Sequence, residues 1–290
     1  MKYHSTNNPG HRVDLKEAIL RSLPPDNGLY MPDVLPVLGD EFWSKWRDLS
    51  FPEIGFSVAE AFFGEDIPAD DIRKIVDGTL EFDAPVVTLA PGDHILELFH
   101  GPTLAFKDFG ARFMARLMAH LTKGEDRMLT VLVATSGDTG GAVASAFHNV
   151  PGTRVVILYP KGKVSGLQEK QLTALGGNIT ALEIEGTFDD CQALVKKAFL
   201  DRDLSERMNL TSANSINLSR LVPQSFYYIH AARQLEEGVK PVFVVPSGNF
   251  GNLTAGLLAK QLGLPVAHFV AATNYNDVVP EYLLKGEYTP

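Results

Sequence analysis

The chain has 290 residues, of which 45% are hydrophobic and 21% charged, and its formal net charge is −9 at pH 7. This composition is typical of a globular protein with a large core, which we expect to divide into two lobes. The acidic balance argues against a nucleic-acid surface and gives no sign of a membrane-binding one, so an anionic ligand needs a local site. No stretch approaches the roughly 18 consecutive apolar residues of a membrane span.

The first residues, MKYHSTNNPGHRV, lack the apolar segment that a signal peptide carries. Cys191 is the only cysteine, which excludes a disulfide within the chain and favours an intracellular, cytoplasmic protein. Because Cys191 falls in a helical pattern, FDDCQALVKKAF, we interpret it as a small core residue.

Residues 1–84 predict an N-terminal domain made mostly of helices and turns. The segment DLKEAILRSL begins with a capping pattern, in which Glu17 follows Asp14 by three residues. PPDNGLYMP is typical of a turn followed by an extended segment, and ADDIRKIV is typical of a short helix.

From about residue 85 the pattern changes to apolar strands that alternate with amphipathic helices. We expect strands at residues 86–89, 94–99, 130–134, 154–159, 180–184, 241–245 and 266–272. Helices are expected in SGLQEKQLTAL, FDDCQALVKKAFL, INLSRLVPQSFYYIHAARQLEE and NLTAGLLAKQL. This alternation predicts an α/β fold with mainly parallel, twisted sheets and helices on both faces. We therefore predict an α/β region over residues 85–290; the family resemblance described below implies that it is the catalytic region, with about 110–225 forming the smaller of two lobes.

One lysine lies in an unusual place, where the extended run HILELF gives way to a helix. Lys107 stands between Phe106 and Asp108. After it, apolar residues recur with the spacing of one helical face: Phe109, Phe113, Met114, Leu117, Met118 and Leu121. A lysine with apolar neighbours either extends its amine to water or uses it chemically, and this stretch alone does not separate the two. We interpret Asp108 as a cap of the following helix.

Two glycine-rich loops follow buried strands in the same way. TSGDTGG, residues 135–141, comes after TVLVA, and SGNFGN, residues 247–252, comes shortly after PVFVV. Glycines let the backbone approach a ligand, and its N–H groups together with the start of the next helix suit an anion. A tight turn that needs glycine only for its conformation is the other interpretation. Since ligands of parallel α/β folds bind beyond the carboxyl ends of the strands, the loops and Lys107 predict one shared site.

Other chemistries fit the sequence poorly. It contains no GxGxxG fingerprint, no Walker sequence, no HExxH and no GxSxG, and its eight histidines are scattered. We therefore expect no metal and no nucleotide. The remaining candidate is the chemistry of a lysine made reactive by desolvation or by cationic neighbours. Pyridoxal 5′-phosphate is an aldehyde that needs one such lysine and one phosphate-binding loop.

The residues around Lys107, ELFHGPTLAFKDFGA, resemble the cofactor-attachment signature of the serine/threonine dehydratase group of pyridoxal-phosphate enzymes, which have fold type II (tryptophan synthase β-like). The resemblance to the threonine synthase family is closer and runs from residue 2 to residue 280. It rests on HGPTLAFKDFG, TSGDTGGAV, LYPKGKVSGLQEKQLTALGGNI, TSANSINLSRLVPQ, VPSGNFGNLTAGLLAKQLGLP and AATNYNDVVP, in that order. Members of that family are longer, and their C-terminal portion carries a hydroxyl residue facing the pyridine nitrogen that has no counterpart here.

The resemblance implies a carbon–oxygen lyase that converts O-phospho-L-homoserine and water into L-threonine and phosphate. Lys107 would bind the cofactor covalently and act as general base and acid. The residues implied for the cofactor phosphate are Gly248, Asn249, Phe250, Gly251 and Asn252, and those implied for the substrate are Ser136, Gly137, Asp138 and Thr139. Lys161, Lys163 and Arg112 are candidates for the leaving phosphate, and residues 214–220 (NSINLSR) and 274–277 are candidates for further polar contacts.

Purely structural roles remain possible for several of these residues. Lys161 and Lys163 fit solvated surface charges, and Asp138 fits a residue that stabilises a helix N-terminus. The alternative functions are a related pyridoxal-phosphate-dependent dehydratase, a β-replacement enzyme, or a non-catalytic fragment that binds a ligand. A nicotinamide-dependent oxidoreductase lacks its fingerprint. The expected partner is a small molecule, not a nucleic acid or a membrane.

Overall fold

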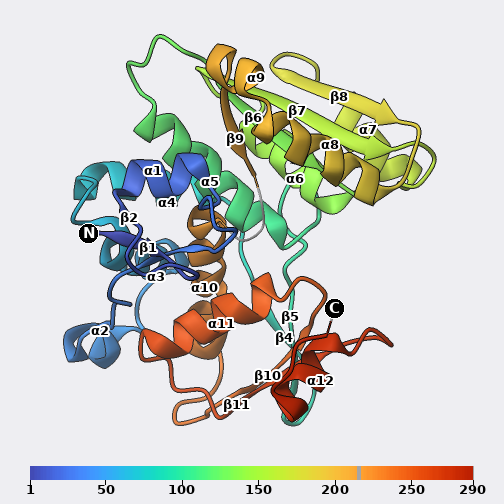
Figure 1. Ribbon diagram of the computed structural model, residues 1–290. Coiled ribbons are helices and arrows are strands. Elements are labelled where there is room, and N and C mark those ends of the chain that lie inside the picture. The colour runs from blue at the N-terminus through green and yellow to red at the C-terminus, as the bar shows by residue number, and fades with distance from the viewer. Residues whose placement is uncertain (214–216, 290) are drawn as a thin grey trace.

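The computed structural model describes residues 1–213 and 217–289 (Figure 1). The α-helices there are α1 (Leu15–Arg21), α2 (Asp40–Lys45), α3 (Phe51–Phe63), α4 (Ala69–Thr79), α5 (Lys107–Leu121), α6 (Asp138–Phe147), α7 (Gly166–Thr173), α8 (Phe188–Leu200), α9 (Arg202–Arg207), α10 (Leu218–Arg233), α11 (Gly251–Gln261) and α12 (Val278–Lys285). The strands are β1 (Tyr3–Ser5), β2 (Arg12–Val13), β3 (Tyr30–Pro32), β4 (Val86–Ala90), β5 (Asp93–Leu96), β6 (Leu129–Ala134), β7 (Thr153–Pro160), β8 (Ile179–Ile184), β9 (Asn209–Ser212), β10 (Val242–Pro246) and β11 (His268–Ala272).

The N-terminal part combines helices α1 to α4 with a small antiparallel sheet in the order β2-β1-β3. The predicted cap of α1 is confirmed, since the carboxylate of Asp14 accepts a hydrogen bond from the Glu17 N–H at 2.8 Å. Strand β3 lies within the predicted extended segment PPDNGLYMP. Strands β1 and β2 were not predicted, because strands of two or three residues show no alternation of apolar and polar positions. The buried Tyr3 of β1 donates to the Phe62 carbonyl of α3 at 3.0 Å and so joins this sheet to the helices.

A four-stranded parallel sheet in the order β8-β7-β6-β9 forms the upper lobe in Figure 1, with α8 on one face and α6 on the other. Helix α8 begins with a capping box between Thr187 and Asp190, as its sequence predicts. Cys191 on α8 is buried, which confirms its interpretation as a core residue. The α/β class with a parallel sheet covered on both faces is therefore confirmed.

The lower part contains two small sheets. Strands β10 and β11 pair in parallel, and the strand expected at residues 94–99 is the shorter β5, which pairs antiparallel with β4. The pairing of β4 with β5 is antiparallel because only two residues join them, and parallel neighbours need a longer crossover connection. Several apolar side chains of these strands face outward, among them Leu89 and Val244.

Helix α10 lies at the centre of the molecule and packs against α3, α5 and α11 (Figure 1). Every residue from Leu218 to Ala232 is buried. A helix that is buried on all sides belongs to the core of a larger protein, which explains why its sequence lacks one clear apolar face. No helix among residues 1–213 and 217–289 is long and apolar enough to cross a membrane.

Candidate active site

Lys107 is the first residue of α5, and residues 97–106 connect it to β5. Its side chain is 25% exposed, and its Nζ lies 3.7 Å from Oδ2 of Asp138 and 5.8 Å from the ring centre of Phe106. Burial lowers the pKa of the Lys107 amine, the charge of Arg220 lowers it further, and Asp138 acts in the opposite direction. The half-buried amine therefore has more of the neutral, nucleophilic form than a surface lysine.

Asp108 does not cap the helix, so the interpretation from the sequence is wrong. Phe106 occupies the cap position without a side-chain hydrogen bond. The buried carboxylate of Asp108 instead accepts hydrogen bonds from the N–H of Thr103 at 2.9 Å and from its hydroxyl at 2.5 Å. Asp108 thereby fixes the loop that leads into Lys107, although burial raises the pKa of this carboxyl group.

The loop of residues 135–141 is organised by one hydroxyl group. Oγ1 of Thr135 accepts hydrogen bonds from the N–H groups of Gly137 and Gly140 at 3.0 and 2.9 Å. Gly137 has φ +145°, and a Cβ there would lie 2.4 Å from Nε2 of Gln168, so the position requires glycine. Nε2 of Gln168 donates to Oδ1 of Asp138 at 2.7 Å. The Asp138 carboxylate at the start of α6 is thus held between Gln168 and Lys107.

The loop of residues 248–252 leads from β10 into α11. Phe250 has φ +58°, a left-handed conformation that is uncommon for a phenylalanine and that turns the chain into the helix. N–H groups in the first turn of a helix have no acceptor within it. Among the described residues, the N–H groups of 248–252 donate no hydrogen bond to another part of the chain. They form a set of donors that is available to an anion.

Helix α10 connects this loop to Lys107. Oδ1 of Asn252 accepts hydrogen bonds from the hydroxyl groups of Tyr227 at 2.6 Å and Tyr228 at 2.9 Å. The ring of Tyr227 also packs edge-on against Phe109, two residues after Lys107, with 5.3 Å between the ring centres. The side chain of Asn252 therefore anchors the loop to the core, which leaves the backbone N–H groups of the loop for the ligand.

Arg220 is a site residue that the sequence did not single out. Its side chain is 1% exposed and Nη1 donates to the Ala213 carbonyl at 2.8 Å, while Nε has no hydrogen-bond partner among the described residues. Burial lowers the pKa of this guanidinium to about 10, and its charge acts on Lys107. The motif NSINLSR contains Arg220, but burial cannot be read from that polar segment. Residues 214–216 of the motif lie outside the described residues.

The other predicted cations are placed on the surface or are paired. Nζ of Lys161 lies 3.1 Å from Oε1 of Glu185, and Lys163 is exposed. Arg112 donates to the Gly78 carbonyl at 2.9 Å and also contacts the carboxylate of Glu81. In residues 274–277, the Asn274 side chain accepts from the Asn276 N–H at 2.9 Å, as expected for a turn. These contacts fit the alternative, structural interpretations.

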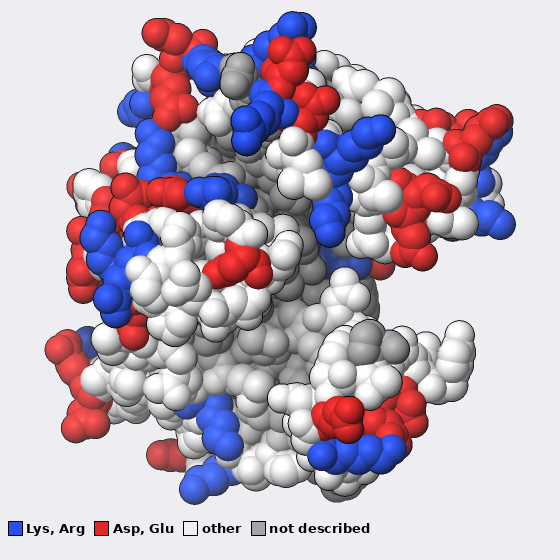
Figure 2. Space-filling model, in the orientation of Figure 1, with Lys and Arg blue, Asp and Glu red and all other residues white. Residues whose placement is uncertain are grey.

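A cavity of about 600 Å³ adjoins the site. Its inner wall contains Ala134, Thr139, Ala213 and Asn249, which belong to the ends of β6 and β9, the start of α6 and the loop before α11. Figure 2 shows a hollow between the upper lobe and the rest of the molecule, with lysine and arginine side chains on its upper rim. Ligand sites of this size are common in enzymes.

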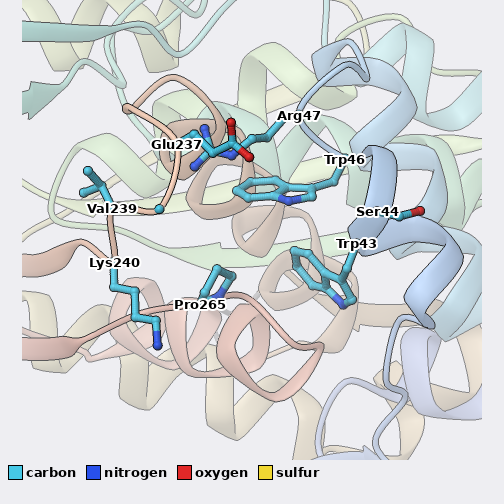
Figure 3. Close-up of a pocket in the computed structure, with 9 residues that line it drawn as sticks. Trp43, Ser44, Trp46, Arg47, Glu237, Val239, Lys240 and Pro265 are labelled. Carbon is cyan, nitrogen blue, oxygen red and sulfur yellow. The ribbon is translucent and has the colours of Figure 1, made fainter.

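A second cavity, of about 320 Å³, lies at the other end of α10 and α11 (Figure 3). Trp43 and Trp46 face Pro265 across it, and the guanidinium of Arg47 lies 4.9 Å above the ring of Trp46. Arg47 donates to backbone carbonyls at the end of α10, including that of Leu235 at 2.8 Å. This cavity lies between the α2 region and the segments that follow α10 and α11, and none of the predicted site residues lines it.

The described residues fit pyridoxal phosphate on two counts. Residues 248–252 offer unpaired backbone donors at the positive end of α11 for the phosphate group. Lys107 offers an amine with a lowered pKa for the aldehyde.

Comparisons with known proteins identify relatives of the whole chain. Residues 2–80 match a family described as the threonine synthase N terminus, and residues 95–290 match the family of pyridoxal-phosphate-dependent enzymes. The threonine synthase of Escherichia coli (strain K12) is 48% identical over the whole chain and over 68% of its own length. Its crystal structure has a TM-score of 0.92 to this chain, over the same shares of the two chains.

More distant relatives give the same result. The threonine synthase of Saccharomyces cerevisiae is 37% identical over 99% of this chain and 60% of its own length. The crystal structure of a pyridoxal-phosphate-bound threonine synthase from Brucella melitensis is 41% identical, with a TM-score of 0.92 over 99% of this chain and 64% of that one. This chain belongs to the threonine synthase family of pyridoxal-phosphate-dependent enzymes.

Proposed function

We propose that the chain catalyses the conversion of O-phospho-L-homoserine and water into L-threonine and phosphate, in threonine biosynthesis. In this reaction the bond between Cγ and the phosphate-ester oxygen breaks, and a water oxygen binds Cβ. The observation that carries the proposal is the position of Lys107, whose amine has a lowered pKa and lies on a helix packed, through Tyr227, against the anchor of an anion-binding loop.

Lys107 has two tasks on this proposal. Its amine would hold the cofactor covalently, and the amine, once free, would take up and return protons at Cα and Cβ of the substrate. Desolvation favours the neutral amine that accepts a proton, and Asp138, at 3.7 Å, stabilises the ammonium that results. Burial and Asp138 thus act in opposite directions on the pKa of Lys107, and burial is the larger effect.

The cofactor is held by the loop of residues 248–252. The N–H groups of Gly248, Asn249, Phe250, Gly251 and Asn252 would bind the cofactor phosphate, and the hydroxyl groups of Tyr227 and Tyr228 hold the Asn252 side chain in place. Pyridoxal phosphate, when bound, supplies the electron sink that makes the Cα proton acidic.

The substrate lies between Lys107 and the loop of residues 135–141. Ser136, Gly137, Asp138 and Thr139 hold its amino-acid end at the start of α6. We assign the leaving phosphate to Arg220, because its buried guanidinium makes no ion pair with another described residue and lies near Lys107. Lys161 and Lys163 stay predictions for this role, and their exposure and the Glu185 contact of Lys161 make them weaker candidates.

We also propose the domain organisation that the sequence predicts. Residues 1–84 form an N-terminal domain and residues 85–290 the pyridoxal-phosphate-binding region, of which about 110–225 is the smaller lobe. The two family matches, to residues 2–80 and 95–290, support this boundary. The single cysteine supports a cytoplasmic location. The negative net charge of the chain supports a small-molecule partner and argues against a nucleic acid or a membrane.

The test measures two products in parallel from protein loaded with pyridoxal phosphate. We expect phosphate and L-threonine from O-phospho-L-homoserine, and little ketoacid from L-threonine. Ketoacid from L-threonine or L-serine without phosphate release would instead identify a dehydratase. A cofactor absorbance band without any turnover would identify a non-catalytic ligand-binding protein.

A further inference from the structure

The cavity of about 600 Å³ has a second wall that the reaction described above does not use. Its outer part lies between the segment of residues 21–27, which begins at the last residue of α1, and helix α8 of the upper lobe. Its inner end reaches Thr139 and Asn249 of the proposed site, and Ala213, whose carbonyl binds Arg220. The cavity therefore connects the outside of the molecule with the place assigned to the substrate.

The charges around this cavity are unusual for the chain. The protein carries a net charge of −9, yet the described residues that line the cavity include Arg21 and Lys196 and no carboxylate. Arg21 lies 3.0 Å from Oε1 of Glu17, so its charge is partly balanced. Lys196 makes no ion pair with another described residue. A cationic wall in an acidic protein concentrates anions at that place.

Both walls are held in position. Asp26 fixes the segment of residues 21–27, since its Oδ1 accepts hydrogen bonds from the Ser5 hydroxyl at 2.7 Å and from the Gly28 N–H at 2.9 Å. The opposite wall begins at the capping box of α8, in which Oδ2 of Asp190 accepts from the Thr187 N–H at 2.7 Å. The lysine thus projects from a regular helix and not from a loose segment.

We propose that this cavity receives the phosphate-bearing end of the substrate and that Lys196 is the cation that selects it. The inference rests on the proposed function, because it needs a substrate that carries a phosphate. Lys196 binds the phosphate at the outer part of the cavity, and the rest of the substrate extends to the inner end, which is lined by Ala213, the residue whose carbonyl binds Arg220. The released phosphate leaves along the same wall. The N-terminal segment contributes to specificity by closing the cavity on the side opposite α8.

The experiment compares Lys196→Gln with Lys197→Gln in protein loaded with pyridoxal phosphate. Lys197 is the neighbouring exposed lysine of α8 and does not line the cavity, so it controls for charge and for helix stability. We expect Lys196→Gln to raise the KM for O-phospho-L-homoserine about tenfold or more, with a much smaller change in kcat. Lys196→Arg should restore most of the affinity. Equal KM values in the two glutamine variants would overturn the proposal.

A second measurement keeps this result separate from the proposed reaction. Binding of inorganic phosphate is followed by phosphorus NMR or calorimetry, which needs no turnover. We expect the Kd for phosphate to rise about tenfold in Lys196→Gln and to stay unchanged in Lys197→Gln. An inactive wild-type protein that still shows this difference would overturn the reaction and retain the cavity as an anion site. Unchanged phosphate binding in Lys196→Gln, with active protein, would overturn the cavity and retain the reaction.

Discussion

The carboxylate of Asp138 lies 3.7 Å from the amine of Lys107, although 31 positions separate them in the chain. Asp138 raises the pKa of Lys107 against the lowering effect of burial. We predict that Asp138→Asn lowers the pKa of Lys107 further, because it removes the negative charge and keeps the size of the side chain. The pH dependence of borohydride-trapped labelling of Lys107 by pyridoxal phosphate measures this, and its midpoint should move to lower pH. Glu185→Gln, which affects the surface pair with Lys161, should leave the midpoint in place. A shift to higher pH would contradict the electrostatic argument.

Replacement of the amine itself gives the strongest effect. Lys107→Ala should abolish the covalent cofactor linkage and reduce turnover by at least about 10²–10⁴-fold, the usual contribution of a general base. The fold should persist, since the side chain is partly exposed and alanine favours a helix. Absorbance spectra, circular dichroism and phosphate release check these points. Lys74→Ala, at an exposed ion pair on α4, is the control. Normal turnover in Lys107→Ala would refute the assignment.

Close contact between α5 and α10 depends on Gly110. A Cβ at Gly110 would lie 2.8 Å from the carbonyl oxygen of Arg220, which neither helix backbone can readily avoid. Gly110→Ala should therefore reduce the free energy of unfolding by about 1–3 kcal/mol and also weaken activity, because it displaces Lys107 and Arg220. Gly166→Ala, at a helical glycine with nothing within 4 Å of its Cβ, should be neutral or slightly stabilising. Urea titrations of the two variants compare them, and equal midpoints would contradict the expected clash.

The hydroxyl group of Tyr227 should matter for the cofactor. Tyr227→Phe removes a hydrogen bond of 2.6 Å to Asn252 and should weaken cofactor binding about fivefold, which corresponds to about 1 kcal/mol. Tyr3→Phe is a matched control, because it removes a buried hydrogen bond of 3.0 Å from the N-terminal part. It should reduce stability by a similar amount without changing the affinity for pyridoxal phosphate. Equal affinities in the two variants would show that the anchor of the loop does not depend on Tyr227.

Stability should depend on pH through His230. This buried ring stacks on Phe51 at 4.2 Å, and burial lowers its pKa below the usual 6.5 while Asp83 opposes the shift. Between the lowered pKa and 6.5 the unfolded chain binds more protons than the folded one. The free energy of unfolding should therefore fall as the pH drops below about 6.5. Urea midpoints at several pH values should show a weaker dependence in His230→Gln than in His268→Gln, which changes an exposed histidine.

Much of the α/β region can be predicted from the sequence, because strands such as β6 are continuous apolar runs and helices α7 and α8 begin with capping boxes. Strand β9 could not be predicted in this way. Its residues, NLTS, are mostly polar, and β9 forms because β6 offers a free edge to it. Tertiary context of this kind often overrides local preference for a strand. The antiparallel pairing of β5 likewise depends on a turn whose effect on the sheet is not visible in residues 94–99.

Some residues of the candidate site could also be predicted from local sequence patterns, and others depend on tertiary packing. Lys107 and the two glycine-rich loops could be found because each is a local pattern. Arg220 and the Tyr227–Asn252 contact could not, because they depend on which helices pack together, and the segment around Arg220 is polar like a surface segment. Asp108 shows the opposite error: its position suggests a cap, but its partner, Thr103, precedes the helix within a folded loop.

Helix α10 has a consequence for how the protein tolerates mutation. Since every residue from Leu218 to Ala232 is buried, no side of this helix is free to vary. In a scan of all single substitutions, intolerance along α10 should be continuous and should not recur every third or fourth position, as it should on α4, where only one side is buried.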